Sequence, residues 1–141
     1  SNETILNSAN DQIRYLNTAR AVSITPLYNV KGEWKAAGPS TTGNFSATAY
    51  YFAKKLHSIL GVPIGIIHTS WGASSVESWM DKETLAGFKQ VVIPDTIPKT
   101  APQQVPTIMY NSMLHPYIGF TIRGVIWYQG ESNRDNANDY H

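Results

Sequence analysis

The side chains that could do chemistry are concentrated in two polar loops, and each loop follows an apolar run. The first loop, His68-Thr-Ser-Trp-Gly72, comes directly after residues 62–67. The second loop, Gln129-Gly-Glu-Ser-Asn133, comes directly after residues 122–128. The second loop places two amides, a carboxylate and a hydroxyl within about one turn, which is more polar functionality than a solvated connection needs. Both loops are therefore candidates for a ligand site.

The first loop has the pattern x-x-Ser-x-Gly, which is similar to the nucleophile elbow of α/β-hydrolases. Ser70 would then be the nucleophile, although His68 stands where that motif has a glycine for its tight turn. The alternative is that Ser70 satisfies local backbone groups while Gly72 lets the main chain turn. An exposed glycine N–H beside a helix N-terminus is also what an oxyanion hole requires, so Gly72 is a separate oxyanion-hole candidate.

The second loop offers two further donors for an oxyanion hole. Either Gln129 or Asn133 could donate an N–H to a developing oxyanion, and the residue types alone leave the choice between them open. Glu131 could orient a partner side chain or bind a sugar hydroxyl. The alternative for all three residues is an Asx-type turn or a cap for a helix that begins near Arg134.

Aromatic and imidazole side chains lie close to both loops in the sequence. Trp71 and Trp127 suit stacking on sugar rings, although aromatic residues in small domains more often belong to the core. His68, at the end of a predicted strand, is a candidate for lining the ligand site. We expect His57 to lie at the surface or at the edge of the core, and His115 to pack at the end of a helix. No spacing matches a zinc signature or a phosphate-binding glycine loop, so we expect no metal and no cofactor.

The elements that must position these loops are strands with buried faces. Residues 62–67 form a β-branched run immediately after a helical pattern, which is typical of a buried strand in a parallel sheet. Ile122–Tyr128 predicts a second buried strand of the same kind. Ile13–Leu16 alternates apolar and polar residues, which predicts a half-buried strand toward a sheet edge, and a short strand is predicted around Trp34.

A helical pattern precedes the first of these loops. Apolar residues recur at helical spacing between a cap at Asn44 or Ser46 and a stop at Gly61. Shorter helical segments are expected at Val76–Met80 and Thr107–Leu114, and an extended surface excursion is expected at residues 89–106. Strands that alternate with helices predict an α/β fold, in which ligands bind at the carboxyl ends of parallel strands.

Composition limits the class of protein and of partner. The 141 residues are 42% hydrophobic and 11% aromatic, which excludes intrinsic disorder and fits one domain or part of one. A formal charge of +1 argues against nucleic acid and favours a neutral or weakly charged ligand. No cysteine is present, so disulfides and cysteine zinc sites are excluded, and no apolar run approaches the roughly 20 residues of a membrane span.

Three stretches of the chain share residues with one known family. They are Val62–Gly72 with Glu77 and Trp79, Tyr110-Asn111 with Met113 and His115-Pro116, and Ile122–Asn133. Together they resemble the sialate O-acetylesterase family, which belongs to the SGNH hydrolase superfamily. The Gln-Gly-Glu-Ser-Asn loop is the most specific of these matches. The resemblance is close over residues 44–133 and looser before them.

This resemblance implies a fold and an activity. The fold would be a three-layer α/β/α, flavodoxin-like arrangement with a parallel sheet, present here as one incomplete esterase domain over residues 1–141. The activity would be that of a serine esterase that removes acetyl groups from sialic acid or related glycans. By position, Gly72 corresponds to the oxyanion-hole glycine of the second family block. In the third family block, Asn133 matches the oxyanion-hole residue by its residue type. Gln129 matches it by its position just after the predicted strand.

Two family motifs do not occur in these residues. The nucleophile motif Gly-Gln-Ser-Asn is absent, and Ser1-Asn2 lacks the strand that would precede it. The Asp-x-x-His motif is also absent, because Asp139 and His141 have a different spacing. We therefore expect the isolated chain to hold oxyanion-hole residues without nucleophile or base and to be inactive or nearly so.

Two alternatives to the esterase interpretation stay open on the sequence. One is a non-catalytic glycan-binding module that stacks sugars on Trp71 and Trp127, and the other is a hydrolase that uses Ser70 with His68 and Glu131. Besides an acetylated sugar, the expected partners are a second copy of the chain or the remainder of the esterase, since an incomplete sheet exposes an edge. The resemblance favours a periplasmic or secreted location, with a cytoplasmic one left open because the sequence begins without an apolar signal region.

Overall fold

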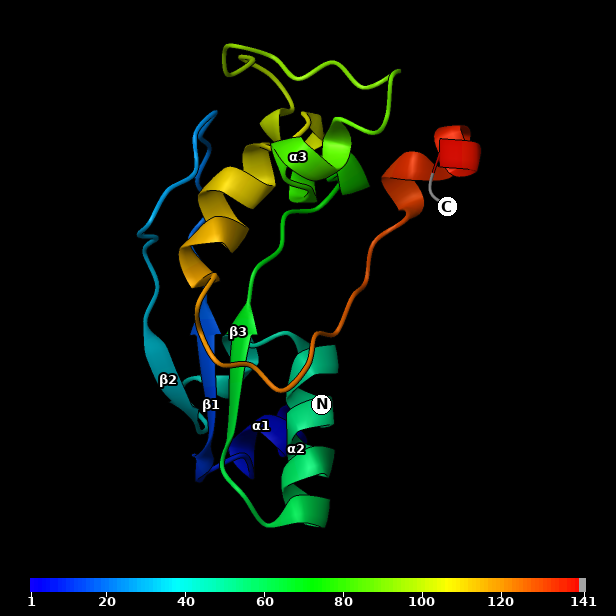
Figure 1. Cartoon of the computed structure of the whole chain (residues 1–141). Coiled ribbons are helices and arrows are strands. Elements are labelled where there is room, and N and C mark those ends of the chain that lie inside the picture. The colour runs from blue at the N-terminus through cyan, green and yellow to red at the C-terminus, as the bar shows by residue number, and fades with distance from the viewer. Residues whose placement is uncertain (140–141) are drawn as a thin grey trace. The chain divides into compact units, whose positions relative to one another are not determined.

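The computed structural model describes the backbone of residues 1–139 and the side chains of residues 1–135, and its internal contacts divide the chain into two compact units (Figure 1). Unit 1 contains residues 1–18 and 31–69, and unit 2 contains residues 19–30 and the chain from residue 70 onward. Each unit has its own hydrophobic core. The sequence predicts a single domain over residues 1–141. Whether the two units behave as one domain depends on whether they unfold together, so this stays a prediction.

Unit 1 is built on a three-stranded sheet with the order β2-β1-β3 (Figure 1). β1 (Asn10–Asn17) pairs antiparallel with β2 (Trp34–Ala37) and parallel with β3 (Ile64–His68). The predicted strand around Trp34 is confirmed. The strand predicted at residues 62–67 is confirmed as β3, and it does pair in parallel, but its partner is β1 and not the segment 122–128. The sheet is mixed, because β2 runs in the opposite direction to its neighbour.

The predicted edge position of the first strand is wrong, because β1 is the central strand of this sheet. Ile13 and Tyr15 are buried while Arg14 is exposed, so the alternation in the sequence does mark a buried face. Leu16, on the face of Arg14, is buried as well. An exposed face and an exposed edge are different properties of a strand, since side chains alternate between faces while backbone hydrogen bonds define the edge. Alternation alone therefore could not place β1 within the sheet.

The main helix of unit 1, α2 (Ala47–Leu60), has the start and stop that the sequence predicts. The Ser46 side chain accepts a hydrogen bond from the backbone of Ala49, and Gly61 ends the helix in the left-handed conformation with φ of 65°. Tyr50 and Ala53 on this helix pack with residues of the sheet to form the core. A shorter helix, α1 (Asn2–Leu6), precedes β1, and a 3-10 turn at Thr42–Asn44 precedes α2.

Unit 2 contains short helical segments joined by irregular chain. They are 3-10 turns at Val76–Trp79, Pro102–Gln104 and His115–Tyr117, helix α3 (Lys82–Leu85), a π-helical segment at Tyr110–Leu114, and a 3-10 segment at Glu131–Asp139. The predicted excursion over residues 89–106 is confirmed as irregular chain apart from one short turn. The core contains Trp79, Ile108, Met109 and Met113. Within residues 1–139, no helix combines the length and the apolar character that crossing a bilayer requires.

Hydrogen bonds with Asn111, Ser112 and His115 fasten residues 19–30 to the helical part of unit 2. The Ser112 hydroxyl donates to the carbonyl of Ala21 at 2.7 Å, and the backbone N–H of Leu27 donates to the carbonyl of Asn111 at 2.8 Å. The His115 ring contacts the carbonyl of Leu27 through Nδ1 at 2.8 Å. His115 therefore has the packing role that the sequence predicts. Residues 19–30 have no regular secondary structure, and these hydrogen bonds satisfy some of their backbone groups instead.

The prediction of a buried strand at Ile122–Tyr128 is wrong. The segment has no regular secondary structure and pairs with no strand within residues 1–139 (Figure 1). Its side chains are exposed, with exposed fractions of 74% for Val125 and 87% for Tyr128. A β-branched run shows that a segment suits the interior of a sheet, but a strand forms only where another strand supplies hydrogen-bond partners. The composition of this run is that of a strand, and the pairing is what is missing.

Candidate functional site

Asn133 joins the two polar stretches of unit 2 through both ends of its side-chain amide. Its Oδ1 accepts hydrogen bonds from the backbone N–H of Val76 at 2.9 Å and from Nε2 of Gln129 at 2.7 Å. Its Nδ2 lies 3.1 and 3.0 Å from the two carboxylate oxygens of Glu77. The side chain is 5% exposed, so these bonds form largely out of water. The loop 129–133 is thereby fixed to residues 74–77.

Gln129 adds a second connection between the same two stretches. Its Nε2 donates to the carbonyl of Ser74 at 3.0 Å as well as to Asn133 Oδ1. A carboxamide nitrogen carries two hydrogens, and both are used by these acceptors. The candidate amides of Gln129 and Asn133 thus both donate to protein groups in this structure. Their role as oxyanion donors stays a prediction, and it requires one of these hydrogen bonds to rearrange when an ester binds.

Glu77 is the member of this network that the sequence did not single out for a chemical role. Its carboxylate receives the Asn133 amide, and its backbone carbonyl accepts from the N–H of Thr107 at 3.0 Å. The sequence did contain a signal for Glu77, because this residue belongs to one of the stretches that resemble the family. Charge-assisted hydrogen bonds of this kind are stronger than those between neutral groups. We refer to Ser74, Glu77, Gln129 and Asn133 as the Asn133 network.

Gly72 lies in a tight turn immediately before the Asn133 network. The backbone N–H of Ser74 donates to the carbonyl of Trp71 at 3.3 Å, and Ala73 within the turn has a φ of 60°. A β-carbon built on Gly72 would meet no atom within 4 Å, so this side of the turn is open. The Ser74 hydroxyl accepts from the indole N–H of Trp79 at 2.8 Å, which anchors the turn in the core.

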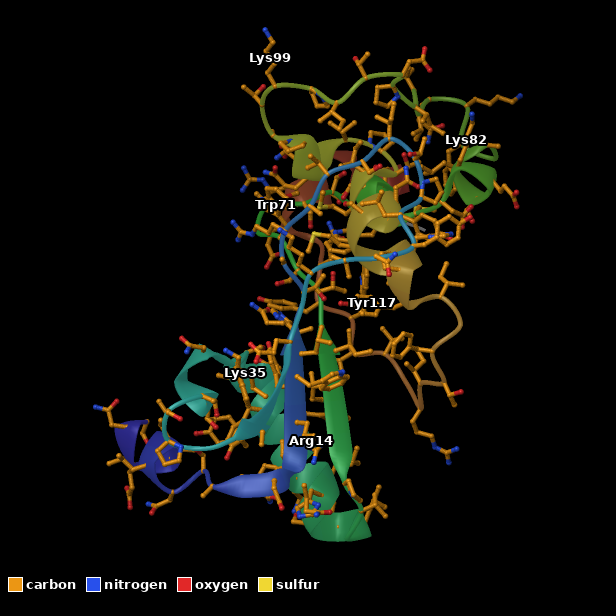
Figure 2. All side chains as sticks on the ribbon, turned by 90° about the vertical axis from the view of Figure 1, so that its left-hand side faces the viewer. Arg14, Lys35, Trp71, Lys82, Lys99 and Tyr117 are labelled. Atoms are coloured by element: carbon orange, nitrogen blue, oxygen red, sulfur yellow. The ribbon has the colours of Figure 1, made fainter. Side chains whose placement is uncertain are left out.

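Trp71 is half-buried and packs against the core of unit 2 (Figure 2). The guanidinium carbon of Arg20 lies 5.0 Å from the centroid of the Trp71 ring, which is within the range of a cation–π contact. One face of the indole is therefore covered by a cation. Trp127, the other predicted stacking residue, is 54% exposed in the extended segment that ends at Tyr128.

His68 lies in unit 1, at the carboxyl ends of the parallel strands β1 and β3. Asn17 and His68 are paired in the register of these strands, and the Asn17 amide oxygen lies 3.0 Å from His68 Nδ1. An amide oxygen accepts hydrogen bonds, so Nδ1 carries the proton and Nε2 is left as an acceptor. Burial lowers the pKa of the His68 imidazole below its ordinary value of 6.5, which favours this neutral form.

The remaining predicted residues lie in unit 2 or beyond the described chain. Ser70 is exposed, and its hydroxyl forms no hydrogen bond to any of the side chains described, those of residues 1–135. Glu131 is exposed in the second loop. The pair of Asp139 and His141 includes a residue outside the described part of the chain. The described side chains contain no group of three that could hold a metal ion.

Comparisons with known proteins give consistent matches. A family model described as carbohydrate esterase, sialic acid-specific acetylesterase, matches residues 10–141. The sialate O-acetylesterase of Homo sapiens is 31% identical over 161 aligned positions, which cover 98% of this chain and 30% of the relative. The sialate O-acetylesterase of Mus musculus is 31% identical over 138 positions, covering 74% of this chain and 25% of the relative.

A solved structure is also similar to this chain. The crystal structure of a carbohydrate acetylesterase from Xanthomonas citri has a TM-score of 0.82 and 38% sequence identity, and the match covers 94% of this chain and 28% of that one. This likeness confirms the predicted α/β class. The chain spans about 30% of the length of the curated relatives that it matches.

Proposed function

The chain belongs to the carbohydrate esterase family of sialic acid-specific acetylesterases, and from this membership we propose that it forms part of an esterase that removes acetyl groups from sialic acid or related glycans. The family inferred from the sequence motifs is confirmed by the same matches. The proposal extends from the family to the activity of the whole enzyme, of which this chain corresponds to about 30% of the relatives' length.

The Asn133 network is the observation that carries this proposal. It ties the loop Gln129–Asn133, the most family-specific stretch, to residues 74–77 that follow the Gly72 turn. Acyl transfer needs N–H donors held in place before the negative charge develops, because reorganisation during the reaction would cost activation free energy. A buried network that fixes the position of one loop against the other suits that requirement.

The reaction proposed for the whole enzyme is acyl transfer through a serine. The serine oxygen bonds to the acetyl carbonyl carbon, a histidine takes the serine proton, and N–H donors stabilise the tetrahedral oxyanion. The bond to the sugar oxygen then breaks, and that oxygen leaves with the proton. Water hydrolyses the acetyl-serine in a second cycle. This chain contributes the Gly72 turn, with its open side, and the loop that the Asn133 network holds.

An assay of the isolated chain with 4-nitrophenyl acetate tests the assignment of roles. We expect the 141-residue protein to hydrolyse this ester no faster than its Ser70→Ala variant, because its sequence lacks the nucleophile and base motifs of the family. A large rate that depends on Ser70 would refute this assignment and establish Ser70 as the nucleophile. Covalent labelling by an organophosphonate, mapped by mass spectrometry, identifies the serine in that case.

The esterase activity itself is tested on the chain expressed with its flanking coding sequence. We expect a Gly-Gln-Ser-Asn motif upstream, an Asp-x-x-His motif downstream, and release of acetate from O-acetylated sialic acid. Binding of acetylated and deacetylated sugars without release of acetate would instead support a glycan-binding module. The Asn133→Ala variant of the longer protein should lose most of its kcat, since the oxyanion loop loses its support.

The proposed location of the enzyme is the periplasm or the exterior of the cell. This part of the proposal rests on the family resemblance alone. Fractionation of cells that express the longer coding sequence tests it, with a cytoplasmic enzyme as the marker for lysis. Recovery of the protein with that marker would contradict a periplasmic or secreted location.

A further inference from the structure

We propose that Arg20, held against the face of Trp71, forms a subsite for the carboxylate of an acidic sugar. The inference rests on the proposed function for its substrate class, an acetylated sugar, and it adds the residue that recognises the acid group. None of the sequence motifs pointed to Arg20. The proposal follows from the position, the exposure and the hydrogen-bonding capacity of this guanidinium.

The contact with Trp71 occupies the face of the guanidinium and leaves its edges available. Arg20 Cζ lies 5.0 Å from the Trp71 ring centroid, and the Arg20 side chain is exposed. Among the described side chains, those of residues 1–135, no carboxylate forms an ion pair with Arg20. The five N–H donors of a guanidinium lie in its plane, so a cation held on an aromatic face can still form two parallel hydrogen bonds to a carboxylate.

Both partners of this contact are held by the core of unit 2. Trp71 packs against the cluster of Trp79, Ile108, Met109 and Met113, and so does Ala21, the residue after Arg20. The carbonyl of Ala21 also accepts a hydrogen bond from the buried hydroxyl of Ser112 at 2.7 Å. The backbone on each side of the contact is therefore fixed, and a ligand need not order it. Such preorganisation lowers the entropic cost of binding.

The position of this pair connects it to the proposed reaction. Trp71 directly precedes Gly72, the candidate oxyanion-hole glycine, so an acid group bound by Arg20 would lie beside the turn that receives the ester. The chain carries a formal charge of only +1, so its net charge supplies little general attraction for anions. Selection of an acidic sugar over a neutral one therefore needs a local cation, and Arg20 provides it.

A binding experiment without any ester tests the subsite. The ¹⁵N-labelled chain is titrated with N-acetylneuraminate and, separately, with the carboxyl methyl ester of the same sugar, which lacks the negative charge. The indole N–H signal of Trp71, assigned with a Trp71→Phe variant, reports binding. We expect the acid to bind about tenfold more tightly than the methyl ester, as for a charge-assisted bidentate contact.

Two substitutions of Arg20 and one matched control complete the test. Arg20→Gln should abolish the preference for the acid, and Arg20→Lys should keep part of it, because lysine retains the charge but lacks the planar fork. Arg14→Gln removes the same charge from β1 (Figure 2) and should leave the preference unchanged. Equal affinities for acid and methyl ester, no binding of the acid, or a preference that survives in a folded Arg20→Gln variant would each overturn the subsite.

The outcome is independent of the proposed esterase activity. The readout is the affinity for a sugar that carries no O-acetyl ester, so an inactive chain can still show the preference. Conversely, an active longer enzyme that binds acid and methyl ester equally would keep the proposed function and exclude Arg20 as the acid-binding residue.

Discussion

At the scale of single residues, Asn133 shows how one buried amide can define the relation between two loops. A carboxamide donates at one end and accepts at the other, and Asn133 uses both ends. Among the described residues, no buried side-chain nitrogen or oxygen is left without a hydrogen-bond partner. Most of the polar contacts between the loops 74–77 and 129–133 thus involve this residue, and the bond from Gln129 to the Ser74 carbonyl adds one more.

Replacement of Asn133 by alanine should reduce the free energy of unfolding by about 2 kcal/mol. The substitution leaves the backbone N–H of Val76 and the carboxylate of Glu77 without their partner in a largely buried position. Urea unfolding of the variant and the parent chain measures the loss. Ser132→Ala changes the exposed neighbour and serves as the control. Equal stability of both variants would show that the network does not contribute to folding.

The stability of unit 1 should decrease as the pH falls below about 6.5, the ordinary pKa of a histidine. Burial lowers the pKa of folded His68, so the unfolded chain takes up a proton at a higher pH than the folded chain does. The contribution of neutral His68 to stability is fully present above the pKa that His68 has in the unfolded chain. It is lost as the pH falls through the lower pKa that His68 has in the folded chain. His68→Gln, whose amide can still donate to Asn17, should flatten this part of the pH profile of urea unfolding.

An NMR titration of the His68 ring checks the cause directly. The apparent pKa of the ring in the folded chain should lie below 6.5. Asn17→Asp places a negative charge where the amide oxygen lies and should raise that pKa, because a carboxylate stabilises the imidazolium. A pKa at or above 6.5 in the parent chain would contradict the burial argument.

At the scale of elements, the turn around Gly72 contains a residue in an unfavourable conformation. Ala73 has a φ of 60°, which a side chain with a β-carbon rarely adopts, and a β-branched residue tolerates it least. Ala73→Val should lower the free energy of unfolding by about 2 kcal/mol, whereas Ala73→Gly should be neutral or mildly stabilising. Thermal unfolding measures both changes.

The control for this turn is the same pair of substitutions at Ala86, which is exposed and has a φ of −60°. There Ala86→Gly should be mildly destabilising, and Ala86→Val should cost less than Ala73→Val. If valine costs the same at both positions, the backbone of Ala73 is not strained.

The elements that the sequence predicted well are those set by nearby residues. Helix α2 follows from the Ser46 cap, the apolar spacing and the Gly61 stop, all within sixteen consecutive residues. The strands β1 and β3 follow from short apolar patterns. These features are local, so the composition of each segment contains the information that determines it.

The elements that the sequence misplaced depend on distant partners. The central position of β1 results from pairing with β2 on one side and β3 on the other, and the pattern of β1 alone contains neither. The run Ile122–Tyr128 has the composition of a strand, but no described segment pairs with it. Likewise, residue types alone identified Gln129 and Asn133 as candidate site residues. The contacts of Glu77 with Asn133 and of Arg20 with Trp71 could be recognised only in the structure.

At the scale of the whole molecule, the exposed apolar segment 120–128 should promote association of the purified chain. Its apolar side chains, with Val125 74% exposed, can pack against the same segment of a second copy of the chain. Sedimentation velocity should show larger species at higher concentration. Val125→Lys should reduce them, whereas Val92→Lys, at a valine that is 81% exposed elsewhere, should not. A monomer at every concentration would contradict this expectation.

The two units can unfold either together or separately. The family match over residues 10–141 includes both units, and we therefore expect one cooperative domain. Ile13→Ala removes buried side-chain atoms from the core of unit 1, and Ile108→Ala does so in unit 2, each at a cost of about 2–5 kcal/mol.

Hydrogen exchange measured by mass spectrometry separates the two possibilities for these variants. In a single cooperative domain, global unfolding limits the exchange of the best protected amides everywhere, so either substitution should accelerate exchange in both units. In two independent domains, Ile13→Ala would accelerate exchange only in unit 1, and Ile108→Ala only in unit 2. Exchange confined in this way would overturn the single-domain prediction. It would also show that the Asn133 network and the Arg20–Trp71 pair, which both lie in unit 2, form without support from the sheet.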